Sequence, residues 1–227
     1  MSRRRALIGD NNGVMPSEGI NAVAAQANMD VKANIPDLST IYLPTNTQNN
    51  CKTIDIVCGS NEVALLSPNY STSTTGLTSI NLHGARAVVA QQGGGWTQKY
   101  GLNGFTKLET INAKLRCSYT TTNYAFRSCN SLANVEFQEN AQTISINMNA
   151  CPLSADSLIS LANGLAVRET QQTLTLSSSR KTMCDSIMGT ISSVTENDVT
   201  YDRFVPDENG TVSLTSFITV TKGWALA

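Results

Sequence analysis

The residue types that most often carry catalysis are sparse in this chain, and their placement argues against an active site. His83 is the only histidine, so a Ser-His-Asp or Cys-His nucleophile arrangement would have to use it. It follows an expected short strand and precedes Gly84 and Arg86, a context that favours an exposed turn histidine over a general base. We therefore expect no catalytic residues and no enzymatic activity, and a cryptic hydrolase is the least favoured alternative.

The main carboxylate cluster comprises Asp198, Asp202, Asp207 and Glu208. Glycoside hydrolysis requires two carboxyl groups that face each other at a fixed separation, whereas these residues fall on one expected strand and its following turn. Calcium could bind at Asp207 and Glu208, but the ligand spacing of a calcium loop is missing. A solvated turn is the favoured interpretation, and we expect no metal and no cofactor.

The cysteines leave two alternatives, disulfides and buried thiols. They are Cys51, Cys58, Cys117, Cys129, Cys151 and Cys184. No Cys-x-x-Cys pair exists, which argues against zinc. Residues 1–10 begin with basic residues but lack the apolar stretch of a signal peptide, so we expect no secretion by that route. Reduced, buried thiols are therefore favoured.

A Gly-rich segment at residues 91–101 contains three successive glycines, Trp96 and Tyr100. A phosphate-binding loop would need Lys-Ser/Thr after the glycines, and Trp96 stands there instead. Two interpretations stay open. Trp96 and Tyr100 either form a surface contact patch, because aromatic side chains supply large area at low entropic cost, or belong to an inserted loop in which Trp96 covers the core.

The segments that would position these residues repeat one apolar phrase. The phrase Leu-x-x-Ile/Val-x-apolar recurs at Leu77, Leu108 and Leu132, with Cys51 beginning a weaker copy, and the steps from Ile54 onward are 26, 31 and 24 residues. Each unit has one small apolar face that only neighbouring units can bury, so a solenoid of short parallel strands is predicted. The expected repeat core is Ile54, Leu77, Ile80, Leu82, Leu108, Ile111, Phe126, Cys129, Leu132, Val135 and Phe137.

The segment Ala-Phe-Arg-Ser-Cys-Asn-Ser-Leu-Ala-Asn-Val-Glu-Phe at residues 125–137 resembles the bacterial leucine-rich repeat of the BspA-like type. One full and three partial matches cover about residues 51–137. The resemblance implies an α/β leucine-rich-repeat solenoid. Residues 151–165, the Gln-Thr-Leu-Thr-Leu strand from Gln172 and the closing 221–227 look like the C-terminal cap of such proteins encoded by bacteriophages, and residues 1–5 are similar to starts of phage structural proteins.

Composition excludes several partners. Charged residues make up 15% of the 227 residues and the formal net charge is −1, so no nucleic-acid footprint is present. No apolar run is long enough to cross a bilayer, and we expect no membrane span.

Residues 1–45 show little periodicity and are expected to form an extended arm without a core of its own. A short helix over residues 22–29 is the only regular element anticipated there. The arm would be held by partner chains; the alternative is that it folds back on its own domain. Its expected contact residues are Arg3, Arg4, Arg5, Leu7, Ile8, Ile41, Tyr42 and Leu43, with the arginines pairing carboxylates across an interface.

Residues 151–227 are expected to form an α/β cap. The pattern predicts a helix capped by Ser154 or Asp156, a strand over 172–177, a helix over 180–192, an inserted hairpin over 194–212, a helix over 213–220 and a final strand over 224–227. An open stack must cover its last apolar layer, which supports a cap at this end.

The predicted organisation is an arm at 1–45, repeats at 46–150 and a cap at 151–227. The resemblance implies a non-enzymatic virion component that binds other virion proteins through residues 1–45, with a homo-oligomer or a bacterial surface ligand as further partners. The alternative is a bacterial surface or secreted adhesin that binds host glycan or protein.

Overall fold

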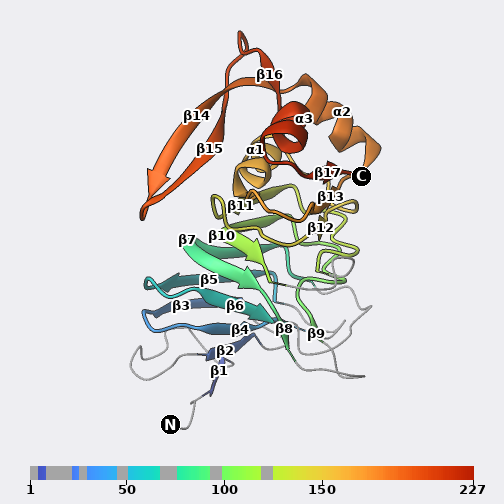
Figure 1. Ribbon diagram of the computed structural model, residues 1–227. Helices are drawn as coiled ribbons and strands as arrows, with labels where there is room; N and C mark the ends of the chain where they lie inside the picture. Colours follow the sequence, from blue (N-terminus) through green and yellow to red (C-terminus); the bar gives the residue numbers. More distant parts are fainter. Residues whose placement is uncertain are drawn as a thin grey trace.

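The computed structural model shows a β-solenoid of about five turns, built mostly of parallel strands with few helices (Figure 1). It describes residues 5–8, 22–25, 30–44, 51–66, 76–92, 99–118 and 125–227, with backbone alone at 5–8, 22–25, 91–92 and 99–100. The predicted solenoid of parallel strands is confirmed.

The strands form one nine-stranded sheet in the order β1-β2-β4-β6-β7-β10-β11, with β3 and β5 stacked beside this path. Their bounds are β1 Arg5–Ile8, β2 Ala22–Ala25, β3 Val31–Ile35, β4 Thr40–Tyr42, β5 Thr53–Cys58, β6 Val63–Leu66, β7 Ser79–Val89, β10 Thr110–Cys117 and β11 Asn134–Phe137. All pairings within it are parallel. Each turn of the solenoid therefore adds strands directly above those of the turn before.

The repeated phrase sets the register of this stack. Ile54 pairs with Ile80, Ile80 with Ile111, and Ile111 with Val135. All the expected repeat-core residues are buried, because alternate side chains of each strand point inward. The unequal steps between repeats reflect differences in the corners within the strands and in the connections between them.

The strand path bends at a corner that becomes shorter toward the C-terminal turns. In β7 four residues separate Asn81 from Arg86, whereas in β10 a single residue separates their partners Asn112 and Lys114. The longer corner in β7 includes His83 and Gly84, with φ of 51° and 76°. The corner divides the sheet into a first segment (β3, β5 and the starts of β7, β10 and β11) and a second segment (β4, β6 and the ends of β7, β10 and β11).

The expected coreless arm is wrong for residues 30–44. β3 pairs with β5 so that Val31 lies in register with Ile54, and β4 pairs with β6. Ile41 and Leu43 are buried in the same core as the later repeats, and Tyr42 is half-buried. These residues form an earlier turn of the solenoid, because Val31, Ala33 and Ile35 alternate inward as a strand requires.

The backbone farther toward the N-terminus also continues the sheet. Arg5, Leu7 and Ile8 lie in β1, which pairs in parallel with β2. Because Ala22–Ala25 is a strand, the helix expected over 22–29 is wrong there. Arg3 and Arg4 lie outside the described residues.

Tight turns precede strands β10 and β11. In the turn before β10, Leu108 N–H donates to Phe105 O, and in the turn before β11, Leu132 N–H donates to Cys129 O. The turns also stack, since Cys129 Sγ donates to Leu102 O at 3.0 Å. None of the six cysteines forms a disulfide, and all but Cys58 are buried.

Helix α1 (Ala155–Gly164) replaces the strand of the next turn and covers the edge of β11. Ser154 caps this helix by accepting from the N–H of Ser157. Ser157 Oγ then accepts from the N–H of Val135 at 2.9 Å, and Ser160 Oγ from that of Phe137 at 2.8 Å. Helix side chains thus satisfy backbone donors that a further strand would otherwise pair.

The remaining C-terminal elements comprise a small parallel sheet, a hairpin and short helices. They are β12 Ile146–Asn147, β13 Thr173–Thr175, α2 Ser178–Ser186, β14 Met188–Glu196, β15 Val199–Pro206, β16 Val212–Ser213, α3 Leu214–Ser216, the π-helix Phe217–Thr221 and β17 Ala225–Leu226. The helix expected over 180–192 ends at Ser186, and Met188 begins the long hairpin of β14 and β15. Apolar residues that suit a helical stripe here serve a two-stranded ribbon instead.

The side chain of Asp30, just before β3, accepts hydrogen bonds that a backbone carbonyl accepts in the next turn of the solenoid. Its Oδ1 accepts from the N–H groups of Lys52 and Thr53, both at 2.8 Å, as Lys52 O does from Thr78 and Ser79 one turn later. Burial alone would raise the pKa of Asp30, but these hydrogen bonds lower it below the ordinary value.

We expect Asp30→Ala to lower the melting temperature at pH 7. Because the pKa of Asp30 is lowered in the folded state, its contribution is present at neutral pH and is lost as pH falls through that pKa. Thermal unfolding followed by circular dichroism between pH 7 and pH 2.5 should show the two proteins converging in acid. Asp37→Ala, at an exposed position of the same turn, is the control. A difference that persists unchanged in acid would contradict the role of the carboxylate.

Candidate binding site

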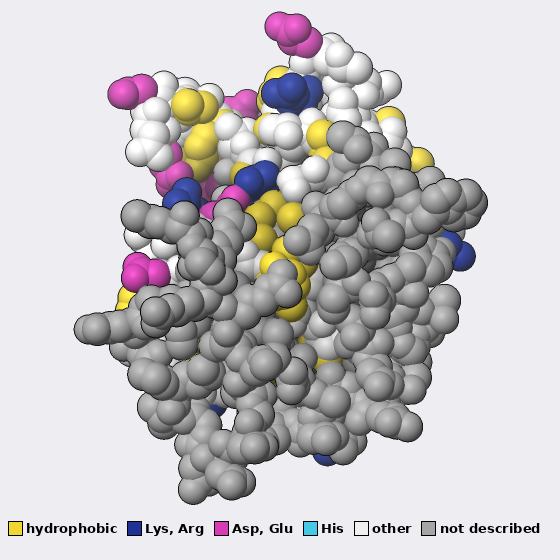
Figure 2. All heavy atoms as spheres, turned by 90° about the horizontal axis from the view of Figure 1, so that it is seen from below, with side chains coloured by type: hydrophobic (Ala, Val, Ile, Leu, Met, Phe, Trp, Pro, Cys, Tyr) yellow, Lys and Arg dark blue, Asp and Glu magenta, His cyan; other side chains and the backbone are white. Residues whose placement is uncertain are grey.

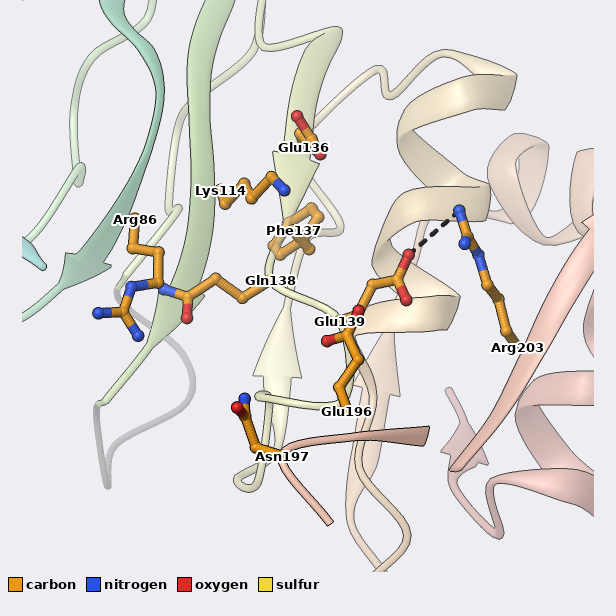
Figure 3. Close-up of a pocket in the computed structure, with 9 residues that line it drawn as sticks. All are labelled: Arg86, Lys114, Glu136, Phe137, Gln138, Glu139, Glu196, Asn197 and Arg203. Atoms are coloured by element: carbon orange, nitrogen blue, oxygen red, sulfur yellow. Dashed lines mark ion pairs between the residues drawn. The ribbon is translucent and has the colours of Figure 1, made fainter. Parts of the chain in front are cut away.

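A polar pocket of about 550 Å³ lies where the tip of the β14–β15 hairpin meets the outer face of the second sheet segment (Figure 3). It is lined by Arg86, Lys114, Glu136, Phe137, Gln138, Glu139, Glu196, Asn197 and Arg203. In Figure 1 the hairpin projects as a long ribbon from the C-terminal helices toward this side of the solenoid. Residues from distant parts of the chain, such as Arg86 and Arg203, therefore meet in one pocket.

The floor of the pocket consists of three outward-facing side chains on neighbouring strands. Arg86 of β7 pairs with Lys114 of β10, which pairs with Glu136 of β11. All three are exposed, whereas Leu115 and Phe137, the next residues along their strands, are buried. Adjacent strands are about 4.8 Å apart, so the floor offers a row of charged groups at that spacing.

The wall of the pocket is held in place by a buried tyrosine and an ion pair. Arg203 Nη2 lies 3.2 Å from Glu139 Oε1, and Tyr201 Oη donates to Glu139 Oε2 at 3.1 Å. Burial and the neighbouring carboxylates of Glu139 and Glu196 raise the pKa of Tyr201. The tyrosine therefore stays protonated as a donor, and it fixes the Glu139 carboxylate against β15.

The hairpin tip supplies the remaining groups. Glu196 pairs with Val199 at the end of the ribbon, and Asn197 and Asp198 form the two-residue turn between them. Both turn residues have positive φ, 48° and 64°, as the hairpin turn that suits the strand twist requires. This turn directs Glu196 and Asn197 to the pocket lining.

A hydrogen-bonded network beside the pocket joins three turns of the solenoid. Arg116 Nε donates to Glu62 Oε1 at 2.8 Å, and a second guanidinium nitrogen of Arg116 pairs with Glu62 Oε2. Gln138 Nε2 also donates to Glu62 Oε1, at 2.9 Å. The hydrogen bond from Arg116 lowers the pKa of Glu62 against the opposing effect of burial. This bidentate pair ties distant turns together and leaves its charges satisfied.

The pocket is balanced in charge. Three of its side chains are cations, Arg86, Lys114 and Arg203, and three are carboxylates, Glu136, Glu139 and Glu196. Viewed from below, basic and acidic side chains of the described residues also lie interspersed (Figure 2). The pocket is therefore rich in donors and acceptors without a dominant sign of charge.

A buried lysine lies behind the wall. Lys222 is 1% exposed, and its Nζ has no hydrogen-bond partner among the described residues. The Nζ lies 5.2 Å from the ring centroid of Phe217 and 5.7 Å from that of Tyr201. Burial lowers the pKa of Lys222 to about 8, and the carboxylates of Asp202 and Glu139 partly offset this effect.

His83 does not line the pocket; it is an exposed residue at the corner of β7. Its Nε2 is 2.7 Å from Asp55 Oδ1, and Asn81 Nδ2 donates to the same carboxylate at 3.0 Å. Asn112 Nδ2 donates in turn to Asn81 Oδ1 at 2.8 Å. These residues form a polar ladder across three strands, with an exposed histidine at a turn of the chain.

The carboxylates singled out in the sequence do not converge. Asp198 lies at the hairpin tip, Asp202 accepts from Ser193 Oγ, and Asp207 accepts from the N–H of Asn209 in the following turn. In the part of the chain that the structure describes, no group of three His, Cys, Asp or Glu residues is arranged to hold a metal.

The structure does not describe the side chains of the two aromatic residues expected to form a contact patch. Trp96 lies outside the described residues. Tyr100 lies in β9 (Lys99–Tyr100), which pairs antiparallel with β8 (Gln91–Gln92).

Sequence reasoning missed the pocket. The outward positions of the repeat phrase, among them Lys114 and Glu136, carried a usable signal, because charged residues alternate there with buried ones. Nothing in the sequence placed Glu196 and Asn197 opposite them.

No protein-family model matches the chain, and the searches of curated proteins and solved structures give no significant match. None of the helices described here is long and apolar enough to cross a bilayer.

Proposed function

We propose that this chain is a non-enzymatic structural and binding component of a bacteriophage virion. In this proposal it is a leucine-rich-repeat solenoid of the BspA-like type, closed by a C-terminal α/β cap. The observation that carries the proposal is the in-register stacking of Ile54, Ile80, Ile111 and Val135, which follows the repeated phrase of the sequence.

Two features support the leucine-rich-repeat assignment. The fullest copy of the phrase buries Phe126, Cys129, Leu132 and Val135. Four-residue turns, each closed by a hydrogen bond from the N–H of residue i+3 to the carbonyl of residue i, precede its strand, as they do in the preceding repeat. Short strands on one side and compact turns on the other are what the BspA-like resemblance implies.

The cap assignment rests on what lies beyond β11. Helix α1 supplies Ser157 and Ser160 to the backbone donors of this strand. Trp224 is buried near the C-terminus and donates through Nε1 to Ala166 O at 2.8 Å. These contacts cover an edge and an apolar layer that would otherwise promote association between sheets.

We place the virion attachment at the N-terminal end of the solenoid. Residues 30–44 form a turn of the solenoid and cannot serve as a separate arm. Among the described strands, β1 is the edge of the sheet at this end, with its outer side unpaired. A neighbouring virion protein, or a second copy of this chain, would add a strand there, because parallel edges pair readily with extended segments.

Immunogold labelling tests the virion assignment. An antibody raised against the purified chain should label intact particles released from cells that carry the gene, and an antibody against an abundant host cytosolic protein is the control. Unlabelled particles would overturn the proposal, provided that mass spectrometry of the same particles also finds no peptide of this chain.

The second candidate function is that of a bacterial surface or secreted adhesin, and the pocket at the hairpin tip is the observation that favours it. This alternative predicts that the antibody labels the envelope of cells that release no particles. The location of the label therefore separates the two functions.

A further inference from the structure

We infer that the pocket between the hairpin tip and the second sheet segment binds an uncharged saccharide. This inference deepens the binding role in the proposed function and rests on it. It names the chemical class of ligand that the groups lining the pocket can satisfy.

The first argument is the pairing capacity of these groups. Lys114 offers donors alone, Glu136 offers acceptors alone, and Asn197 offers both. A sugar hydroxyl donates and accepts, so neighbouring hydroxyls can bond to both the cations and the carboxylates of the lining. Neighbouring hydroxyls on a sugar ring are also close enough to contact adjacent strands of the floor.

The second argument is the balance of charge. A polyanion would gain from Arg86 and Lys114 but would approach Glu136 and Glu196, and a polycation would meet the reverse. Like-charge contacts of this kind cost several kcal/mol and suppress the wrong partner. An apolar ligand is disfavoured as well, because Phe137, the one aromatic residue in the lining, is 2% exposed.

The third argument separates the groups that hold the pocket from the groups available to a ligand. Arg203 and Glu139 pair with each other, and Gln138 is bonded to Glu62. Lys114 and Glu136 have no hydrogen-bond or ion-pair partner among the described residues, although they face outward on adjacent strands (Figure 3). The paired groups form a fixed wall, and the unpaired groups on the floor are free to contact a ligand.

The test measures binding of four tetrasaccharides to the full chain by isothermal titration calorimetry. Maltotetraose and the N-acetylglucosamine tetramer are uncharged, tetragalacturonate is anionic, and the glucosamine tetramer is cationic. We expect at least one uncharged probe to bind with a Kd on the order of 0.01–1 mM. Both charged probes should bind about tenfold more weakly or not at all.

Matched variants locate the site. Glu136→Gln and Lys114→Met should each weaken binding of the uncharged probe about tenfold, since each removes a charge-assisted hydrogen bond. Glu109→Gln and Lys107→Met change the same residue types at exposed positions outside the pocket lining and should leave binding unchanged. Circular dichroism of all four variants checks that each is folded.

Three outcomes would overturn the inference. They are stronger binding of a charged probe, no binding of either uncharged probe, and binding that Glu136→Gln and Lys114→Met leave intact. If the antibody labels particles and any of these results is obtained, the saccharide inference fails and the virion role stands. If the chain binds the saccharide but the antibody labels no particle, the virion role fails and the saccharide inference stands.

Discussion

Replacing Ile111 by alanine should destabilise the chain by about 2–5 kcal/mol. Ile111 is 1% exposed and lies between Ile80 and Val135 in the central column of the core. The substitution removes buried apolar surface and leaves a cavity that neighbouring turns cannot fill, because the backbone hydrogen bonds on both sides of β10 fix their separation.

Urea unfolding followed by circular dichroism measures this effect. Each turn of a solenoid is stabilised mainly by its neighbours. We therefore expect the variant to unfold at a lower urea concentration and in two transitions, one for the turns on each side of β10. Glu109→Ala, an exposed change just before the same strand, should stay within about 0.5 kcal/mol of the parent chain. A loss below about 1 kcal/mol for Ile111→Ala would contradict tight packing at this position.

Replacing Lys222 by methionine should stabilise the chain at pH 7 by about 1–3 kcal/mol. The ammonium is buried and its Nζ has no hydrogen-bond partner among the described residues, while Asp202 and Glu139 compensate it only in part. Methionine keeps most of the side-chain volume and its contact with Phe217 without carrying a charge into the interior.

The pH dependence has a definite sign. The pKa of Lys222 is lowered to about 8 in the folded chain, so the unfolded chain binds more protons between about pH 8 and pH 10.5, and stability rises with pH there. The advantage of Lys222→Met should therefore shrink by about half between pH 7 and pH 9.5.

Urea unfolding at both pH values measures this change. Lys107→Met, an exposed lysine changed in the same way, is the control and should show no such trend. A destabilised Lys222→Met variant at pH 7 would show that the ammonium holds a compensating partner.

The N-terminal turns show where sequence pattern was insufficient. Val31 occupies the position of Ile54 in the preceding turn, but Asn28 stands three residues before it, where the phrase has Leu or Cys. The carboxylate of Asp30 accepts the hydrogen bonds that a backbone carbonyl accepts in the next turn, and Ala33 occupies an inward-facing position with a short side chain. Such substitutions are visible only once the neighbouring turn is in place, which is why residues 30–44 were expected to lie outside the solenoid.

The C-terminal hairpin also depends on contacts that the local sequence pattern does not determine. The turn at Asn197 and Asp198 is local, but Met188 and Ile191 fit a helical stripe as well as a strand, so the boundary between α2 and β14 depended on pairing with β15. The sequence also contains no signal that Lys222 is buried, because Tyr201 and the carboxylates of Asp202 and Glu139, which lie near its ammonium, come from other segments of the chain.

The sequence by itself determined the parallel stacking from Ile54 to Val135, because alternation of apolar residues acts within each strand and repeats at intervals that neighbouring turns can share. Only the tertiary structure decided that the chain from Asp30 joins the stack and that Glu196 and Asn197 line one pocket with Lys114 and Glu136. Contacts of this second kind join residues far apart in the chain, and their free energy depends on burial and charge balance that no local pattern records.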